Sequence, residues 1–539
     1  MKRDFSLLAG RQFDLLVCGG GIYGAWTAYD AALRGLSVAI VEQGDWAAAT
    51  SSASSKLIHG GLRYLETYDF KLVRKALAER QMLLEMAPHR VWPLRFGVPI
   101  YHNSRIGTLK LKAGLTLYDF LAGLSGKNMA SLDIAHCHFD HKAFAERFSA
   151  FDSEGLKGGF TYDDAQTDDA RLVLELIDGA MTAGAVCVNY CKLTGLIETN
   201  GLVSGATVQD QLISTNTQIY AKQIVNTTGQ WMALSEPGRN WCQLTKGIHL
   251  VMPAVLADEA LLLIAQSDGR VFFMIPWYGM TLLGTTDTEY SIDLDHVTAE
   301  PAKVESADVA YLLAEANHYL KAAWTEADIV GRYAGVRVMK QSGKTSLSAV
   351  SREWELKTAD NGVHYSIGGK LTSARADAAW IVNTVCAQLG INIPCATRNR
   401  RFPWTPEESY SEWVVAISIQ ASQLGIDQES AKWLIRRHGK RVGEVLHIIA
   451  DARALAERIV PALPFIHADL LFCARTEMAI HLEDLLRRRM PLLILAQPAE
   501  NLLRRIAETV AAPMGWNKAA MNREVEAVKL KIATVAIRN

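Results

Sequence analysis

Closely spaced glycines near the start of the chain could bring backbone amides against a phosphate. Gly19, Gly21 and Gly24 form a G-x-G-x-x-G pattern between the apolar run 15–18 and a helical stretch over about 23–34. The first glycine permits a tight turn, the second lets amides approach a pyrophosphate, and the third lets helix and strand pack closely. The helix would present free N–H groups and a positive dipole end there, so the pattern indicates phosphate binding.

A carboxylate follows at the spacing that a dinucleotide site requires. Glu42 closes the apolar run 36–41, about twenty residues after the glycines, where an acid can reach the adenosine ribose hydroxyls. Strand, glycine turn, helix, second strand and acid together predict a dinucleotide-binding βαβ unit.

The segment after Glu42 bears on which dinucleotide binds. An NAD domain would usually continue with another helix and strand, whereas this chain continues with Ser, Ala and Thr and then a glycine pair. Small hydroxyl residues suit an extended segment along a long cofactor, so FAD is favoured over NAD. A nicotinamide-linked dehydrogenase remains an alternative, and the purified protein would then be colourless because it would carry no flavin. The predicted cofactor contacts here are Ser51, Ser52, Ser55, Lys56, Leu57 and Gly60.

Two later turns are predicted to complete the cofactor site. The strand 221–226 leads to Gly229, and the strand 363–367 leads to a second glycine turn before a helix over about 373–389. The N terminus of that helix could face the flavin and stabilise the negative charge of its reduced form. The predicted contacts are Gly229, Gly369, Leu371 and Thr372.

Composition limits the class of protein. The chain has 539 residues, too many for a single core, and its 49% hydrophobic and 21% charged content is that of a globular protein. A net charge of −1 offers no basic field for nucleic acid. The eight cysteines form no C-x-x-C pair, so we expect reduced, mostly buried thiols and no metal site. No apolar run is long enough to span a bilayer, and no secretory signal is visible.

The segment 50–66 reads TSSASSKLIHGGLRYLE. It looks like a signature of the FAD-dependent, quinone-linked glycerol-3-phosphate dehydrogenases, a family that the sequence resembles along nearly its whole length. Further matching blocks occur in the same order and at similar spacing: Lys246–His249, Ile275–Trp277, Gly284–Asp287, Ser351-Arg352, Gly368–Thr372, Arg437–Gly439 and Thr476–Arg489.

The resemblance implies a reaction and a set of residues. Family members oxidise sn-glycerol 3-phosphate to dihydroxyacetone phosphate, passing hydride to flavin N5 and electrons to membrane quinone. The residues carried over to the substrate pocket are Arg63, Tyr64, His249, Thr286, Arg337, Arg352 and Lys370. Arg337 and Arg352 would bind phosphate, Lys370 would lie near flavin and substrate oxygen, and His249 would take the hydroxyl proton. His249, Lys370 and Arg337 are thus the predicted catalytic residues.

The resemblance also implies an α/β fold with a glutathione-reductase-like, Rossmann-type FAD-binding domain. We expect this domain to be discontinuous, over residues 12–85, 145–232 and 335–397. An antiparallel-sheet substrate domain would be inserted over 86–144 and 233–334. From about Thr405 helical patterns dominate, which predicts a C-terminal helical domain over 398–539 that opens on a linker at Arg398–Pro403.

Two departures from the family pattern concern the predicted pocket. Val338-Met339 stands where the family usually has Pro-Leu after Gly-x-Arg, and Gln230 stands where Pro is usual before Trp231. Losing proline frees φ and restores an N–H at each turn. The departures therefore bear on the reach of Arg337 and on substrate preference more than on the fold.

The stretch 109–121 is apolar with two lysines, a composition compatible with a membrane interface or with a core-packed helix. Because the family's acceptor is quinone, we expect a peripheral protein on the cytoplasmic face of the cell membrane, with Leu111, Leu115 and Leu117 as candidate anchors. A homodimer is one option for the oligomeric state. An oxygen-reducing glycerol-3-phosphate oxidase, a dehydrogenase of another phosphorylated polyol and a flavin-containing RNA-modifying protein remain alternatives.

Overall fold

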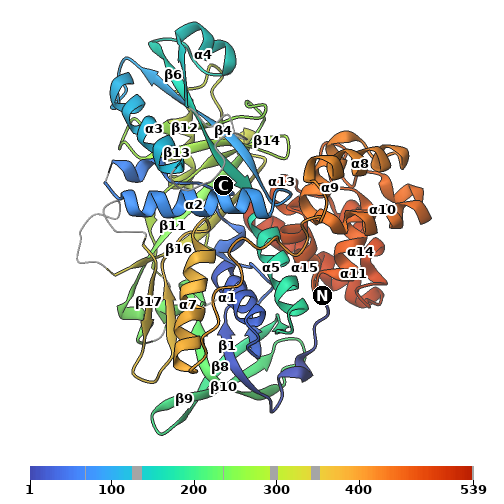
Figure 1. The fold of residues 1–539 in the computed structure, drawn as a ribbon. Helices are drawn as coiled ribbons and strands as arrows, with labels where there is room; N and C mark the ends of the chain where they lie inside the picture. The colour runs from blue at the N-terminus through green and yellow to red at the C-terminus, as the bar shows by residue number, and fades with distance from the viewer. Residues whose placement is uncertain (67, 124–135, 235, 292–301, 342–352, 537–539) are drawn as a thin grey trace.

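The computed structural model describes residues 1–66, 68–123, 136–234, 236–291, 302–341 and 353–536. It contains two β-sheets and a group of C-terminal helices (Figure 1). In that view the first sheet lies in the lower half, the second in the upper half, and the helices from α8 onward to the right.

The first sheet is the predicted dinucleotide-binding unit. Its strands run in the order β17-β18-β10-β1-β2-β7, with β8 and β9 continuing beside β10. Five neighbouring strands, from β18 to β7, are parallel, and their continuous apolar runs suit a sheet covered on both faces. The strands are β1 (Gln12–Cys18), β2 (Val38–Val41), β7 (Val186–Val188), β8 (Cys191–Thr199), β9 (Leu202–Asp210), β10 (Asn216–Asn226), β17 (Glu355–Thr358) and β18 (His364–Ile367).

Three helices pack beside this sheet. The helix α1 (Ile22–Leu33) lies between α5 (Asp169–Thr182) and α7 (Ala374–Gln388). Ten of the twelve residues of α1 are buried, because it packs against both helices and the sheet. This arrangement confirms the Rossmann-type α/β fold.

The second sheet is antiparallel except where β12 pairs with β4, which confirms the mostly antiparallel second domain. Its strands are β3 (Leu57–Ile58), β4 (Val91–Tyr101), β5 (Cys137–Asp140), β6 (Leu156–Thr167), β11 (Cys242–Met252), β12 (Ala260–Ile264), β13 (Val271–Trp277), β14 (Met280–Gly284), β15 (Thr288–Glu289) and β16 (Gly331–Lys340). It is accompanied by α2 (Phe70–Met86), α3 (Thr108–Gly123), α4 (His141–Arg147) and α6 (Ser306–Asn317). The strands β3 and β6 belong to this sheet although they fall within ranges predicted for the FAD domain, and the domain boundaries stay a prediction.

The C-terminal part is helical, as predicted. It contains α8 (Tyr410–Gln423), α9 (Gln428–His438), α10 (Val442–Asp451), α11 (His467–Thr476), α12 (Leu482–Asp484), α13 (Leu492–Leu495), α14 (Glu500–Ala511) and α15 (Lys518–Ala536). Buried residues of α14 recur at helical spacing, from Leu503 through Ile506 to Val510. Trp433 packs edge-on against Trp92 of β4 at 5.9 Å, which joins these helices to the second sheet.

The helix α3 contains the segment 109–121 that was predicted to contact the membrane, but the side chains that it exposes are not the predicted ones. Leu111 and Leu115 are buried in the core and cannot touch a membrane, so the expectation that they are anchors was wrong. The exposed apolar side chains of this helix are Leu109 and Phe120. No helix among the described residues is long and apolar enough to cross a bilayer.

Candidate active site

A cavity of about 620 Å³ lies between the two sheets, and residues from both line it. The first sheet contributes the ends of β1 and β2, and the second contributes β11 and β16. Most of the predicted site residues lie in this lining: Gly19, Gly21, Glu42, Ser51, Ser55, Leu57, Gly229, His249, Arg337, Gly369, Lys370, Leu371 and Thr372.

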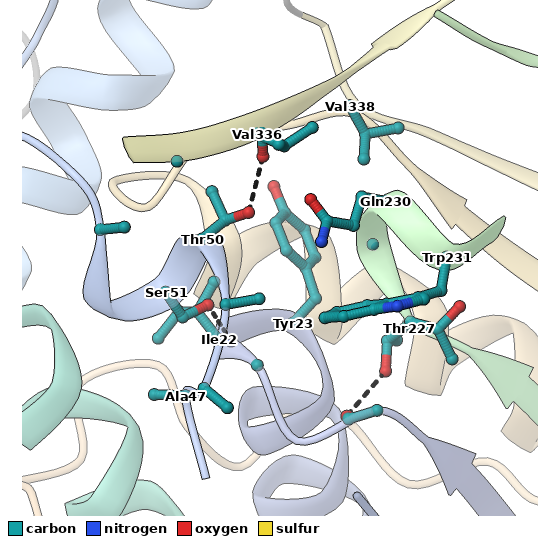
Figure 2. Close-up of a pocket in the computed structure, with 18 of the residues that line it drawn as sticks. Ile22, Tyr23, Ala47, Thr50, Ser51, Thr227, Gln230, Trp231, Val336 and Val338 are labelled. Atoms are coloured by element: carbon teal, nitrogen blue, oxygen red, sulfur yellow. Dashed lines mark hydrogen bonds between the residues drawn. The ribbon is translucent and has the colours of Figure 1, made fainter. Parts of the chain in front are cut away.

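The glycine turn has no room for side chains. Gly19 has a φ of +111°, and a Cβ on it would lie 2.7 Å from the carbonyl oxygen of Thr227. A Cβ on Gly24 would lie 1.8 Å from the carbonyl oxygen of Gly19, so close packing of helix on strand requires glycine there. The Ser51 hydroxyl accepts a hydrogen bond from the Ile22 amide at 2.9 Å, which ties the serine-rich segment to the start of α1 (Figure 2).

Glu42 organises the loop at the adenosine end of the cavity. Its two carboxylate oxygens accept hydrogen bonds from the backbone amides of Gly20 at 2.7 Å and Gly44 at 2.8 Å. Burial raises the pKa of this carboxyl, and the two amides partly oppose that shift. The carboxylate therefore sits at the end of β2 with both oxygens fixed, where a ribose could be recognised.

Another part of the cavity is built around the second glycine turn, Gly368–Thr372. The Tyr23 hydroxyl accepts from the Lys370 amide at 3.0 Å and donates to Asp377 at 2.8 Å. A Cβ on Gly369 would lie 1.7 Å from that hydroxyl. The Lys370 ammonium lies 3.5 Å from the centre of the Tyr64 ring, a cation–π contact that places both predicted residues together.

His249 is held rigidly in the middle of the second sheet. Its imidazole stacks on the Tyr333 ring at 4.9 Å, and a Cβ on Gly284 would meet the ring at 2.4 Å. The Nε2 atom lies 2.8 Å from the Ser55 hydroxyl. Burial, and then the nearby cations Arg337 and Lys56, lower the pKa of His249 well below its usual value. The imidazole is therefore neutral and able to accept a proton.

Arg337 presents a guanidinium to the cavity from β16. It donates to the Thr285 hydroxyl at 2.8 Å and to the Thr286 carbonyl at 3.2 Å, and it pairs with Asp287 at 3.2 Å. Gly247 makes room for it, because a Cβ there would lie 2.1 Å from Nη2. The Thr286 side chain is buried behind the lining and accepts from the backbone, so Thr286 positions Arg337.

Several other predicted residues stand outside the lining. Lys56 is buried, with its ammonium 2.7 Å from Asp169, and the Gly60 amide donates to Asp164 at 3.1 Å. The Ser52 hydroxyl donates a hydrogen bond to the Ala49 carbonyl. Arg63 is half-buried. Arg352 lies outside the described residues.

The cavity also contains residues that the sequence did not assign to it. Tyr23 rises from α1 into the cavity, beside Gln230 and Trp231 (Figure 2). Val338 lines the cavity as well, so both departures from the family pattern fall in the same site. The position of Tyr23 inside the glycine motif is the sequence feature that could have identified it as a residue of the site.

One buried cluster outside the cavity resembles a metal site in composition. His438, Asp469 and Cys473 offer ligand atoms within 4.8 Å of one another. However, Arg437 pairs with Asp469 at 2.5 Å, and burial raises the pKa of the Cys473 thiol well above its usual value. A protonated thiol and an adjacent guanidinium suit a hydrogen-bonded core rather than a cation. All eight cysteines are free, and six are buried, as expected.

The lining fits a flavin dinucleotide. The glycine cradle and Glu42 lie at one end, where pyrophosphate and ribose are bound in such folds. His249, Lys370 and the serine-rich segment line the same cavity.

Comparison with known proteins agrees with this fit. Residues 14–375 match the model of the FAD dependent oxidoreductase family, and residues 407–521 match that of the C-terminal domain of alpha-glycerophosphate oxidase. The chain is 34% identical to a glycerol-3-phosphate dehydrogenase of Synechocystis, with 97% of each chain covered. It is also 34% identical to the aerobic glycerol-3-phosphate dehydrogenase of Bacillus subtilis, over 86% of this chain and 88% of that one.

The chain belongs to the FAD-dependent glycerol-3-phosphate dehydrogenase family. A solved glycerol-3-phosphate dehydrogenase from Bacillus halodurans, complexed with FAD, superposes with a TM-score of 0.77 at 28% identity, covering 98% of this chain and 96% of that one. Membership in this family confirms the resemblance noted in the sequence, the oxidoreductase class and the prediction of FAD in preference to NAD.

Proposed function

We propose that this glycerol-3-phosphate dehydrogenase family member oxidises the C2 alcohol of sn-glycerol 3-phosphate to dihydroxyacetone phosphate. The observation that carries the proposal is the placement of a neutral imidazole and a guanidinium, His249 and Arg337, in one cavity whose other end suits a dinucleotide. The relatives named above for the same activity support it. The glycine turns and the serine-rich segment would hold FAD, which would supply the hydride acceptor for C2.

The residues of the chain supply binding and proton transfer. Arg337 holds the phosphate, since a guanidinium fork matches phosphate oxygens, and its pairing with Asp287 keeps the fork oriented. The substrate hydroxyl replaces the Ser55 hydroxyl at Nε2 of His249, which then takes the substrate proton as general base. A dianionic phosphate on Arg337 also offsets the cationic charge that disfavours the imidazolium. Lys370 lies near the reacting oxygen.

The electron acceptor and location are further parts of the proposal. We assign a quinone as acceptor and a peripheral position on the cytoplasmic face of the membrane, supported by the exposed Leu109 and Phe120 of α3. Oxygen is the second candidate acceptor, because the C-terminal match is described for an alpha-glycerophosphate oxidase. Peroxide release equal to turnover would favour oxygen. A homodimer stays a prediction.

Arg337→Ala tests the phosphate assignment. The Michaelis constant for sn-glycerol 3-phosphate should rise by at least about tenfold, because a charge-assisted pair is lost. Slow oxidation of glycerol, which has no phosphate, should change little. Equal losses for both substrates would contradict the assignment of Arg337 to phosphate binding.

A further inference from the structure

The turn Leu485–Arg489 carries three successive arginines, and the function proposed above uses none of them. This turn is a π-helix, a wider form that is frequent at functional sites. Arg488 and Arg489 are buried, although arginine is rarely buried unless paired. The partner that they share, Asp45, lies far away in the sequence.

Both arginines bind the same carboxylate. Arg489 Nη2 lies 2.9 Å from Oδ1 of Asp45, and Arg488 Nε lies 2.5 Å from Oδ2. Burial alone would raise the pKa of Asp45, but the two guanidiniums outweigh it and hold the pKa below the usual range. Arg489 also donates to the Glu477 carbonyl at 2.7 Å, and Arg488 pairs with Asp484 at 2.6 Å. The pairs therefore join Asp45 to the C-terminal helices.

Asp45 belongs to the loop that shapes the adenosine end of the cavity. The preceding residue, Gly44, donates to Glu42. The following residue, Trp46, is fully buried against Gly20, where a Cβ would meet its ring at 2.4 Å. The Ala47 amide then donates to the Gly20 carbonyl at 3.1 Å. Fixing Asp45 thus fixes both Glu42 and the middle of the glycine turn.

A second contact between the same parts reinforces this link. The Trp46 indole N–H points to the Met478 sulfur at 3.3 Å, and the Asn189 amide donates to the Met478 carbonyl at 3.1 Å. Met478 of the C-terminal part thus contacts both the loop and its neighbour Asn189. No described residue of the C-terminal part is in the cavity lining, so this part acts on the loop from outside the cavity.

We propose that the Arg488–Arg489 pair makes the C-terminal helical domain a structural part of the adenosine end of the FAD site. Arg488, Arg489 and Asp45 are positioning residues, because they act through Glu42 and the glycine turn. FAD binding and docking of the C-terminal domain then stabilise each other, since coupling between two binding events is reciprocal. The proposal concerns the adenosine moiety and holds whichever alcohol the enzyme oxidises.

The test compares Arg489→Met with Arg487→Met. Arg487 lies in the same turn but approaches the Tyr333 ring, at 5.5 Å, rather than Asp45. The dissociation constants of FAD and of ADP are measured on deflavinated protein by fluorescence and calorimetry. Arg489→Met should weaken both ligands by at least tenfold, and Arg487→Met should leave both near the wild-type values. Unchanged ADP binding by folded Arg489→Met would overturn the proposal, because ADP probes the adenosine end alone.

A second measurement keeps the proposal testable if Arg489→Met does not fold. In the deflavinated wild-type protein, saturating ADP should slow proteolytic cleavage in the segment 398–409, which precedes α8, at least fivefold. Riboflavin, which lacks the adenosine moiety, should not slow it. Cleavage at the same rate with and without ADP would show that the C-terminal domain docks independently, and that would contradict the proposal.

Discussion

The Tyr23 hydroxyl accepts a hydrogen bond from the backbone amide of Lys370 at 3.0 Å, joining the first helix of the chain to the glycine turn that precedes α7. The same hydroxyl donates to Asp377 at 2.8 Å, and burial raises its pKa well above the usual value. The hydroxyl is therefore protonated and has both a donor and an acceptor partner. This relationship fixes the backbone beside the predicted catalytic lysine.

Tyr23→Phe should disturb the glycine turn before α7 without creating a cavity in the core, because the aromatic ring is kept. The variant leaves a buried amide and a carboxylate each with one partner fewer, which should lower the free energy of unfolding by about 1–3 kcal/mol. Because Lys370 loses its anchor, kcat should fall by about tenfold or more. Denaturant unfolding and steady-state kinetics check both effects. Unaltered kcat with reduced stability would show that the bond is structural only.

The pH dependence of kcat/KM should reflect the lowered pKa of His249. A general base works in its neutral form, and burial together with Arg337 and Lys56 keeps the imidazole of the free enzyme neutral well below pH 6.5. We therefore expect no loss of kcat/KM between pH 7 and about pH 5.5 beyond the loss that comes from protonation of the substrate phosphate, whose second pKa is about 6. His249→Asn should reduce kcat by about 10²-fold or more at every pH in this window. A tenfold fall per pH unit starting near pH 6.5 would contradict this assignment.

His438 should make the folded state sensitive to mild acid. Burial lowers the pKa of His438 to about 4, even though the paired Asp469 opposes the shift. In the unfolded chain this side chain takes up a proton below about pH 6.5. Stability is thus lost as pH falls from about 6.5 toward 4, by about 2 kcal/mol between pH 7 and 5.

Urea unfolding at the two pH values tests this account. His438→Gln should show the smaller loss on acidification, although it is less stable at pH 7. His318→Gln, at an exposed position, is the matched control. Identical pH slopes for wild type and His438→Gln would contradict the role given to His438.

The exposed apolar side chains of α3 should govern membrane binding. Leu109 is 85% exposed and Phe120 is 62% exposed, beside the exposed Lys110 and Lys112. Ser at both apolar positions should reduce sedimentation with anionic vesicles by about tenfold or more. The matched control, Ser at Val415 and Ile419 of α8, also removes two exposed apolar side chains. Equal vesicle binding by both double variants would place the anchor elsewhere.

The βαβ unit could be predicted because its signals are local. Glycine spacing, apolar runs and the closing acid lie within about thirty residues, and the structure places α1 at Ile22–Leu33, within one residue of expectation at each end. The inserted antiparallel sheet followed from the resemblance, whereas the helical C-terminal part was predicted from the helical patterns of its sequence.

The side-chain directions could not be predicted in the same way. Lys56 was expected at the cofactor, but it is drawn into the core by Asp169, 113 residues later. Leu111 and Leu115 face the core because the second sheet covers that side of α3. Asp45 carried no visible motif, and its arginine partners lie 443 and 444 residues away. Such pairings depend on tertiary packing, which residue spacing along the chain does not encode.

Anaerobic mixing of the purified protein with sn-glycerol 3-phosphate tests the central claim most directly. Absorbance of the oxidised flavin band is followed in a stopped-flow instrument, with glycerol and another phosphorylated polyol as comparisons. We expect rapid and complete bleaching by sn-glycerol 3-phosphate and much slower bleaching by glycerol. A flavin that stays oxidised with sn-glycerol 3-phosphate but is bleached by the other phosphorylated polyol would contradict the proposed substrate while leaving the fold and the cofactor in place.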